Sequence, residues 1–345
     1  MHDLRKILVI RLSSIGDVVH ALPAVAALGT AYPNSKITWL IEARYAEILE
    51  GNPFVERVLT TNTLAWQKEP LSRRTLREAA RTVRALREET FDAVIDFQGL
   101  IKTGIIARIA RARRRIGLAS KWLKEPGAAL FYSERAPARG SRHVVEENLA
   151  LVKWLGVQPG PWQFPLPRSE AGEQWAEAQL ARLGAAQFIL VSPGAGWAAK
   201  RWPPGCYAQL IGMLEQEGWT VVLTGSAAEE NEILAILRES AAQHAAYVPA
   251  SIRQFITLAR RARLFIGGDT GPMHLAAAVG TPIVAMFGPT DPSRNGPFDP
   301  ADITLSNGEP VNHTRRAKTP RFLEGVSIAD VVAAVHERLA RNHEC

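Results

Sequence analysis

Short apolar runs alternate with longer amphipathic segments along nearly the whole chain. Runs of aliphatic and β-branched residues, such as Lys6-Ile-Leu-Val-Ile10, are typical of buried parallel strands. Segments with apolar residues at helical spacing indicate helices that cover those strands. The alternation therefore predicts an α/β protein whose parallel sheets are covered on both faces.

The expected elements divide into two series. The first contains strands at 6–10, 36–41, 93–97 and 114–117, and helices at 17–31, 43–50, 72–89, 100–110 and 142–155. The second contains strands at 187–192, 219–224, 264–267 and 282–286, and helices at 169–183, 204–217, 227–241, 251–261, 271–279 and 327–341. Between them, residues 156–167 are rich in proline and lack periodicity, which indicates a linker. We predict two Rossmann-like domains, over residues 1–162 and 163–326, with parallel sheets that face a central cleft, and a C-terminal helical segment at 327–345.

Composition favours a cytoplasmic enzyme. The chain has 345 residues, of which 47% are hydrophobic, enough to build one large or two ordinary domains. Its two cysteines, Cys206 and Cys345, are too few for a disulfide framework or a zinc site. No apolar run approaches the ~20 residues that cross a bilayer, and a charged strand near the N-terminus argues against a signal peptide.

Positive charge is concentrated in the first half of the chain. Residues 1–160 contain 25 Lys and Arg against 16 Asp and Glu, whereas the remainder contains 16 against 18. Arg77, Arg81 and Arg84 fit a solvated helix face, but the denser cluster at 102–124 suits an anionic partner. Nucleic acid, anionic lipid and a phosphorylated saccharide all match this charge. Only Trp122 supplies an aromatic ring within the cluster, which disfavours a single-strand binder.

Residues 264–280 carry the most informative motif. An apolar strand ends at two glycines, Asp269 follows, and a helix begins at Gly271-Pro272. Such a corner directs free backbone N–H groups and the positive end of a helix dipole at a ligand above the strand. Asp269 and His274 are expected to project into the same place. Without further observations, Asp269 is equally well explained as a helix cap.

A similar corner follows the first strand, in Arg11-Leu-Ser-Ser-Ile-Gly-Asp17. Asp17 is expected at the carboxyl edge of a parallel sheet, where open α/β sheets bind ligands, although an acid near a helix start is also a common stabilising feature. The loop lacks the glycine pattern of dinucleotide-binding proteins and the Gly-Lys-Ser/Thr of a P-loop.

The second half contains two further corners. Pro193-Gly-Ala-Gly196 lets backbone approach a ligand closely, and Lys200 after it is placed to neutralise a diphosphate. In the other, Glu229 or Glu230 either binds ribose hydroxyls or favours a helix start. Together these corners indicate a nucleotide pocket.

These motifs resemble those of the ADP-heptose:lipopolysaccharide heptosyltransferases, glycosyltransferase family 9. The resemblance rests on the Asp17 corner, on Ser192-Pro-Gly-Ala followed by Lys200-Arg-Trp-Pro203, and on Asp269-Thr-Gly with His274, in order over nearly the whole chain. Asp96-Phe-Gln-Gly-Leu-Ile-Lys102 and Lys124-Glu-Pro126 are similar to the heptosyltransferase I branch, which adds the first heptose to Kdo on lipid A. The resemblance implies the GT-B glycosyltransferase fold, with the acceptor bound by the first domain, the ADP-sugar by the second, and the last helix packed back on the first.

The resemblance also implies roles for single residues, with Asp17 as the catalytic base. The expected donor-binding residues are Lys200 at the phosphate, Thr270, Gly271 and His274 around the diphosphate, Asp269 at the heptose hydroxyls, and Glu229 (or Glu230) at the ribose. The sequence departs from the family at Ala195 and Gly196, where hydroxyl side chains often touch the phosphates and backbone N–H groups would substitute. The expected acceptor-binding residues are Lys102, Lys121 and Lys124, which suit the anionic groups of Kdo and lipid A.

The chemistry that this resemblance implies needs few groups. ADP is already a good leaving group, so the reaction requires a base for the attacking hydroxyl and positive charge for the departing diphosphate. Asp17 would be the base, so that the acceptor hydroxyl attacks in line and the transferred carbon is inverted. Lys200 and the helix start at Gly271 would supply the positive charge for the diphosphate. Neither corner contains Asp-x-Asp. We therefore expect no metal and no cofactor besides the donor substrate, ADP-heptose.

Three other functions remain open. They are a nucleotide-sugar epimerase with the same architecture, a heptosyltransferase with another core sugar or a protein as acceptor, and a nucleic-acid binder, which only the basic first half supports. The favoured expectation is a monomeric cytoplasmic enzyme that does not bind nucleic acid. It would touch the cytoplasmic leaflet of the inner membrane peripherally, because the Kdo-lipid A acceptor lies there.

Overall fold

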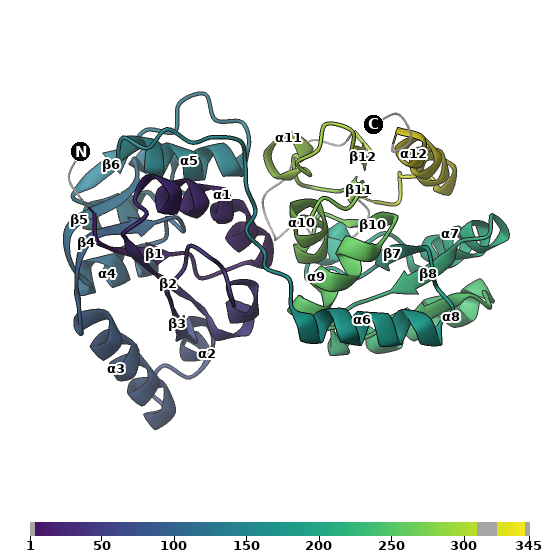
Figure 1. The fold of residues 1–345 in the computed structure, drawn as a ribbon, viewed down its shortest axis with the longest axis horizontal. Coiled ribbons are helices and arrows are strands. Elements are labelled where there is room, and N and C mark those ends of the chain that lie inside the picture. The colour runs from purple at the N-terminus through teal and green to yellow at the C-terminus, as the bar shows by residue number, and fades with distance from the viewer. Residues whose placement is uncertain (1–3, 309–322, 342–345) are drawn as a thin grey trace. The chain divides into compact units, whose positions relative to one another are not determined.

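The structure is a computed structural model that describes residues 4–308 and 323–341. The chain divides into two compact units, Met1–Pro167 and Arg168–Cys345 (Figure 1). The division falls at the end of the proline-rich segment 156–167. Among the described residues, no helix combines the length and the apolar character that a bilayer span requires.

The first unit is built on a six-stranded sheet of order β3-β2-β1-β4-β5-β6 in which all neighbours are parallel. Its elements are β1 (Lys6–Ile10), α1 (Ile15–Ala31), β2 (Lys36–Glu42), η1 (Ala43–Ile48), β3 (Arg57–Thr61), α2 (Thr63–Lys68), α3 (Arg73–Arg87), β4 (Thr90–Asp96), α4 (Ile101–Ile109), β5 (Arg111–Leu118), η2 (Ser120–Trp122), η3 (Pro126–Phe131), β6 (Glu134–Ala136) and α5 (Val144–Trp154). Helices α1 and α5 pack together on one side of the sheet, and α3 and α4 lie on the other (Figure 1).

The second unit repeats this plan with a parallel sheet of order β12-β11-β10-β7-β8-β9. Its elements are α6 (Glu170–Arg182), β7 (Phe188–Ser192), η4 (Ala198–Lys200), α7 (Pro204–Gln216), β8 (Thr220–Leu223), η5 (Ala227–Glu229), α8 (Glu230–Ser240), β9 (Ala245–Tyr247), α9 (Ile252–Arg261), β10 (Leu264–Gly268), α10 (Gly271–Ala278), β11 (Ile283–Phe287), α11 (Pro292–Asn295), β12 (Ile303–Ser306) and α12 (Ile328–Arg341).

The prediction of an α/β protein with two parallel, Rossmann-like sheets is confirmed. The pattern missed the sheet-edge strands β3, β6, β9 and β12 and the short helices α2 and α11. These strands are only three to five residues long and are partly exposed, so they lack the continuous apolar run that marks a central strand.

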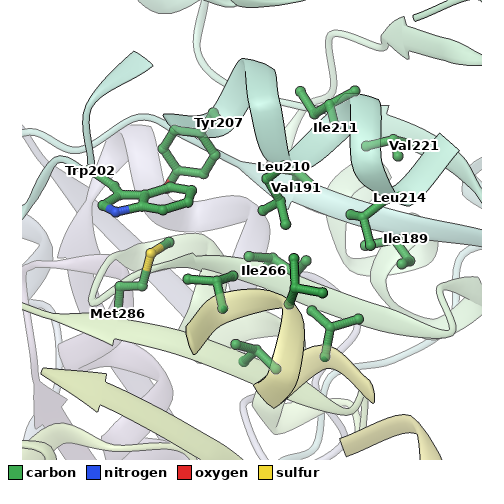
Figure 2. Close-up of a cluster of buried hydrophobic side chains, with 14 of the residues drawn as sticks. Ile189, Val191, Trp202, Tyr207, Leu210, Ile211, Leu214, Val221, Ile266 and Met286 are labelled. Atoms are coloured by element: carbon green, nitrogen blue, oxygen red, sulfur yellow. The ribbon is translucent and has the colours of Figure 1, made fainter. Parts of the chain in front are cut away.

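A hydrophobic cluster of the second unit anchors the segment that carries Lys200. Figure 2 shows Trp202 and Tyr207 at one end of this cluster, with Val191 and Ile266 of the central strands. The indole Nε1 of Trp202 donates to the carbonyl of Val326 at 2.9 Å, and the Trp202 and Tyr207 rings meet edge to face at 5.0 Å between centroids. Burial of Trp202 therefore fixes the chain two residues beyond Lys200.

The final helix packs against elements of the second unit. In the described structure α12 packs on α7, β11 and β12 of the second unit, and Val331 and Val335 are fully buried in the cluster of Figure 2. The apolar face of α12 is thus buried within the second unit. The packing of this helix on the first domain stays a prediction. Its amphipathic pattern predicted a buried face but not the surface that would bury it.

Candidate functional site

Four adjacent strands of the second sheet end in loops at one edge. In the order β11-β10-β7-β8, their carboxyl ends lead into the corners at Thr290, Asp269, Pro193–Gly196 and Glu229. Because parallel strands place their carboxyl ends together, these corners are neighbours, and open α/β sheets bind ligands at this edge.

Asp269 is the centre of this edge. Its side chain is only 3% exposed, and it lies between the end of β10 and the start of α10. Lys200 Nζ donates to Asp269 Oδ2 at 2.5 Å and to the Asp269 carbonyl at 3.0 Å. The Thr290 hydroxyl donates to the same Oδ2 at 2.6 Å, and His274 Nε2 contacts Oδ1 at 3.1 Å. The sequence-predicted residues Lys200, Asp269 and His274 therefore form one cluster.

The charge on Asp269 is set by its neighbours. Burial disfavours the ionised carboxylate, but the hydrogen bond and charge of His274, together with those of Lys200, outweigh burial and hold the pKa of Asp269 well below its usual range. The buried carboxylate is thus anionic at neutral pH and holds Lys200 in place.

The start of α10 supplies anion-binding groups beside this cluster. Thr270 is the N-cap, and its side chain makes no capping hydrogen bond. Within the described structure, the buried Thr270 hydroxyl has no hydrogen-bond partner. An added Cβ on Gly268 would come within 2.8 Å of the Lys200 carbonyl, so a glycine lets Lys200 approach the strand. A lysine, a free hydroxyl and a helix N-terminus together suit a phosphate.

Glu229 occupies the neighbouring corner. Its Oε2 accepts from the backbone N–H of Ser226 at 2.8 Å and from the Ser226 hydroxyl at 2.6 Å. An added Cβ on Gly194 would overlap Glu229 Oε1, so the carboxylate lies directly against the glycine loop. Glu230, in contrast, is exposed in the first turn of α8. Of the two acids left open by the sequence, Glu229 is the one held at the loop.

The loop residues Ala195 and Gly196 differ in their environment. Ala195 is buried and its carbonyl accepts from Arg201 Nε at 2.9 Å, while Gly196 is exposed. Arg201 also reaches Glu232 of α8 at 3.0 Å. Arg201 therefore ties the glycine loop to the helix that follows Glu229, which keeps the two corners together.

In the first unit, Asp17 lies in the first turn of α1 at the carboxyl edge of the sheet. Its Oδ1 forms an ion pair with Arg11 Nη2 at 2.5 Å, and its Oδ2 accepts from the backbone N–H of Ser14 at 2.8 Å and from the Ser14 hydroxyl at 3.1 Å. The Asp17 side chain is 40% exposed and that of Arg11 only 8%. Asp17 caps the helix, as its position also suggested, and presents an oriented carboxylate to solvent.

The loop after β4 supports this corner. Arg11 Nη1 also donates to the carbonyl of Phe97, and Gln98 Oε1 accepts from the backbone N–H of Leu12 at 3.0 Å. Asp96, which is buried, accepts from the N–H of Gln98 at 2.8 Å and from the Tyr132 hydroxyl at 2.7 Å. Burial raises the pKa of Asp96 although these groups donate to it. The motif 96–102 thus braces the Asp17 loop.

The three predicted acceptor lysines lie in loops and helices that follow β4 and β5. Lys102 Nζ donates to the Thr63 hydroxyl at 3.2 Å, and Thr63 in turn donates to the buried Glu42. Lys121 and Lys124 are exposed, and the Lys121 ammonium sits 4.0 Å from the centroid of the Trp122 ring. The described structure brings Lys102 to the ends of β2 and β3 but shows no direct contact between the three lysines.

Part of the basic cluster at 102–124 has a structural role. Arg114 Nε pairs with Glu134 of the adjacent strand at 2.6 Å, and Arg115 Nε donates to the Phe131 carbonyl at 3.1 Å. These arginines join β5 to the segment before and within β6, so they are not available in full to an anionic partner.

Two residues of these edges were missed as site residues. Thr290 contacts Asp269, and Arg11 holds Asp17. Strand β11 ends at Phe287 and is followed by a glycine and a proline before Thr290, much as β10 ends at two glycines before Asp269. This shared pattern was the available signal for Thr290. In residues 4–308 and 323–341 no group of three or more His, Cys, Asp and Glu side chains is arranged to hold a metal ion.

Comparisons with known proteins agree with this geometry. The family model described as "Glycosyltransferase family 9 (heptosyltransferase)" matches residues 79–322. The "Lipopolysaccharide heptosyltransferase 1" of Pseudomonas aeruginosa is 30% identical over 307 residues, which cover 88% of this chain and 84% of that protein. The solved structure "E. coli heptosyltransferase WaaC with ADP" is 26% identical, covers 96% of this chain and 99% of that one, and superposes with a TM-score of 0.81. A second structure, "E. coli heptosyltransferase WaaC with ADP-2-deoxy-2-fluoro heptose", has the same identity and coverage with a TM-score of 0.78.

Proposed function

The chain belongs to glycosyltransferase family 9, the heptosyltransferases, and on that premise we propose that it transfers L-glycero-D-manno-heptose from ADP-heptose to Kdo of Kdo-lipid A, with inversion at the transferred carbon. The observation that carries this proposal is the buried cluster of Asp269, Lys200, His274 and Thr290 beside the start of α10. A carboxylate, a cation and a helix N-terminus at one sheet edge suit a ligand with hydroxyls at one end and a diphosphate at the other.

The second unit would bind the donor. Lys200, Thr270, Gly271 and His274 would surround the diphosphate, with backbone N–H groups of Ala195 and Gly196 beside it. Glu229 would hold the ribose, which its position against the glycine loop supports.

A heptose hydroxyl would bind at the Asp269 carboxylate. An ionised carboxylate has roughly four lone-pair positions, about two on each oxygen. In the described structure Oδ2 accepts from Lys200 and Thr290, whereas Oδ1 contacts His274. Oδ1, which has fewer of these contacts than Oδ2, is the oxygen at which a heptose hydroxyl would bind.

The first unit would bind the acceptor and supply the base. Asp17 would take the proton of the attacking hydroxyl, and the exposed part of its carboxylate supports access by that hydroxyl. Lys102, Lys121 and Lys124 would bind the anionic groups of the acceptor. The leaving ADP needs no proton, because the developing charge on its diphosphate is matched by Lys200 and the helix N-terminus.

We further propose that the reaction takes place at the cytoplasmic face of the inner membrane, because a lipid A acceptor is held in a bilayer. No metal takes part in the proposed mechanism.

The test is release of ADP from ADP-heptose with and without Kdo-lipid A. Transfer should require the acceptor, and Asp17→Asn should lower kcat by about 10²- to 10⁴-fold, the usual contribution of a general base, while ADP binding is retained. ADP release without an acceptor, or epimerised donor, would instead favour the epimerase, and transfer only to deeper core sugars or to a protein would change the acceptor.

The matched control is Asp330→Asn. Asp330 accepts from the Ser327 hydroxyl at 2.7 Å in the first turn of α12, so it caps a helix as Asp17 does but lies outside the proposed site. Asp330→Asn should keep full transfer. If Asp17→Asn loses ADP binding together with transfer, the role of Asp17 is structural and the proposed mechanism fails.

A further inference from the structure

The end of β2 holds a buried carboxylate for which the proposed mechanism has no use. Glu42 is the last residue of β2 and is 2% exposed. Its Oε1 accepts from the backbone N–H of Thr63 at 3.0 Å and also from the Thr63 hydroxyl. Among the residues that the structure describes, no cation forms an ion pair with Glu42. Burial of a carboxylate is costly unless its hydrogen bonds compensate, so the group beyond Thr63 matters.

Lys102 is the cation that Thr63 connects to this carboxylate. Lys102 Nζ donates to the Thr63 hydroxyl at 3.2 Å. A lysine ammonium can only donate, and a hydroxyl has a single hydrogen, so Thr63 accepts from Lys102 and directs its own hydrogen to Glu42. These three residues are called here the Lys102 tether. Because one end is a cation and the other an acid, each hydrogen bond polarises and strengthens the other.

The tether lies along the edge of the first sheet that carries Asp17. It joins the end of β2, the start of α2 after β3, and the first turn of α4 after β4, in a sheet of order β3-β2-β1-β4 whose strands end together at this edge. The backbone N–H of Glu42 donates to the Leu12 carbonyl at 3.1 Å, and the Gln98 side chain accepts from the Leu12 N–H at 3.0 Å. The corners after β2 and β4 are therefore both bonded to the loop that leads to Asp17.

Tyr45 lies within electrostatic reach of both carboxylates of this edge. It follows β2 in η1. Burial raises the pKa of the Tyr45 phenol, Arg44 opposes that rise, and the negative charges of Glu42 and Asp17 add to it. The tether and the proposed base thus belong to one part of the sheet edge.

We propose that Glu42 and Thr63 are positioning residues that hold the Lys102 ammonium where it binds the carboxylate of the acceptor sugar. This role rests on the proposed function, in which Asp17 faces a hydroxyl of that sugar. The bond to Thr63 uses one of the three N–H donors of Lys102 in the described structure. The side chain is only partly buried, so the ammonium retains donors for a ligand. A lysine whose conformation is already restricted loses less entropy when the ligand binds.

The proposed acceptor carries two kinds of anion, the sugar carboxylate and the lipid A phosphates. The tether is bonded through Leu12 to the loop of the base. A carboxylate and an attacking hydroxyl on the same sugar must be bound by neighbouring groups of the protein. The position of the tether therefore favours the sugar carboxylate.

Steady-state kinetics of Thr63→Val test the tether. Valine removes the hydroxyl and nearly preserves the shape of the side chain, and its backbone N–H can still donate to Glu42. The KM for the Kdo acceptor should rise about three- to tenfold, the contribution of one hydrogen bond, while kcat and the KM for ADP-heptose stay unchanged. Thr63→Ser keeps the hydroxyl and is the matched control, so its acceptor KM should stay near that of the wild type. A fall in kcat or a rise in donor KM in Thr63→Val would show a general structural role and overturn the proposal.

A double-variant cycle tests whether Thr63 acts through Lys102. Lys102→Met removes the ammonium and should raise the acceptor KM by about tenfold or more, as expected for a lost charged hydrogen bond. In the Lys102→Met background, Thr63→Val should add nothing further. Effects of the two changes that multiply would show that Thr63 acts independently of Lys102, and the proposal would be wrong.

An acceptor whose sugar carboxyl group is reduced to a hydroxymethyl group identifies the anion. The wild type and Thr63→Val should have equal KM for this acceptor, because the group that Lys102 binds is gone. If Thr63→Val still weakens the reduced acceptor but no longer weakens one without phosphates, Lys102 binds a phosphate and the carboxylate assignment is wrong.

Labelling of Lys102 with an amine-reactive ester, measured by peptide mass spectrometry without substrates, separates the tether from the proposed function. Labelling should be about threefold faster or more in Thr63→Val, because the hydroxyl that holds the ammonium is lost, and unchanged in Thr63→Ser. The exposed Lys124 is the internal control and should react equally in all three proteins. If the wild type transfers heptose to no Kdo acceptor while Thr63→Val still reacts faster, the proposed function fails and the tether stands. Equal labelling of Lys102 in the wild type and Thr63→Val overturns the tether, whatever the transfer assay gives.

Discussion

A buried arginine determines how Asp17 is presented. Arg11 is 6% exposed, and its guanidinium joins the Asp17 carboxylate to the Phe97 carbonyl. The planar guanidinium offers donors in a fixed fork, which an ammonium does not. Arg11 therefore orients the carboxylate as well as balancing its charge, and in the proposed mechanism it would act on catalysis through Asp17.

We expect Arg11→Met to lower kcat by about a hundredfold, the size of effect that a small misplacement of a reacting group produces. The KM for ADP-heptose should stay unchanged, because Arg11 does not belong to the donor site. Arg11→Lys should recover part of the rate, since it restores the charge without the fork. Steady-state kinetics of the three proteins check this, and a common rise in donor KM would contradict it.

The ion pair of Lys200 and Asp269 couples stability to donor binding. Asp269 is buried, so removal of Lys200 leaves a carboxylate with less compensation, and the loss of one partner of a buried pair typically costs about 3–5 kcal/mol. Thr290 and His274 still contact Asp269, so the cost here falls at or below the lower end of that range.

Lys200→Ala should therefore show two losses. The KM for ADP-heptose should rise by roughly ten- to a hundredfold, as expected for a charged hydrogen bond to phosphate, and the protein should unfold at lower denaturant concentration. The double variant Lys200→Ala/Asp269→Asn should recover stability but not donor affinity. Urea unfolding and donor titration measure the two effects, and recovery of both would remove Lys200 from the donor site.

At the scale of elements, α12 is tied to the second sheet by a buried ion pair. Arg338 Nε donates to Asp302 Oδ1 at 2.9 Å, and the backbone N–H of Ile283 donates to the same oxygen at 2.8 Å. Burial raises the pKa of Asp302 to about 6, although Ile283 and Arg338 oppose that shift. Asp302 precedes β12, so the pair connects the helix, the edge strand and β11.

This carboxyl predicts a pH dependence of stability. An aspartate in the unfolded chain titrates near pH 4, so the folded protein holds the proton more tightly. The resulting stabilisation is fully present below about pH 4 and is lost as the pH rises through about 6. A shift of two pKa units corresponds to about 3 kcal/mol.

Asp302→Asn should remove this contribution. Its stability relative to the wild type should therefore rise between about pH 4 and pH 7, by up to the ~3 kcal/mol given above. Urea unfolding of both proteins at several pH values gives this difference. A difference that is constant over this range would show that Asp302 does not titrate in it.

At the scale of the molecule, the two units offer different chemistry on similar sheets. The first carries the excess of positive charge and an exposed carboxylate, and the second carries a buried carboxylate with a lysine and a helix N-terminus. This division fits a reaction in which the base and the charge that stabilises the leaving group come from separate parts of the chain.

Because Lys200 and α10 are assigned the role that a divalent cation has in other nucleotide-sugar enzymes, transfer should be unchanged by EDTA. Initial rates with excess EDTA, and after addition of Mg²⁺ or Mn²⁺ to treated enzyme, check this expectation. Loss of activity that a single metal restores would show that the charge on the leaving diphosphate is not met by the protein alone.

The sequence by itself determined the central strands, most of the longer helices and the glycine corners that end the strands. These are local properties, since a buried strand needs a continuous apolar run and a tight corner needs glycine or proline. The motifs around Asp17, Lys200 and Asp269 were therefore identified without the structure, and so was the family.

Tertiary structure decided which of these corners meet and what surrounds them. Thr290 reaches Asp269 because β11 lies beside β10, and Arg11 is held by Phe97 because β4 lies beside β1. The exposed edge strands and the surface that buries α12 likewise depend on neighbours distant in the chain. The spacing of apolar residues along a helix or strand indicates that one of its faces is buried. Only the packed fold determines which other element covers that face, because the contacts join segments that are distant in the sequence.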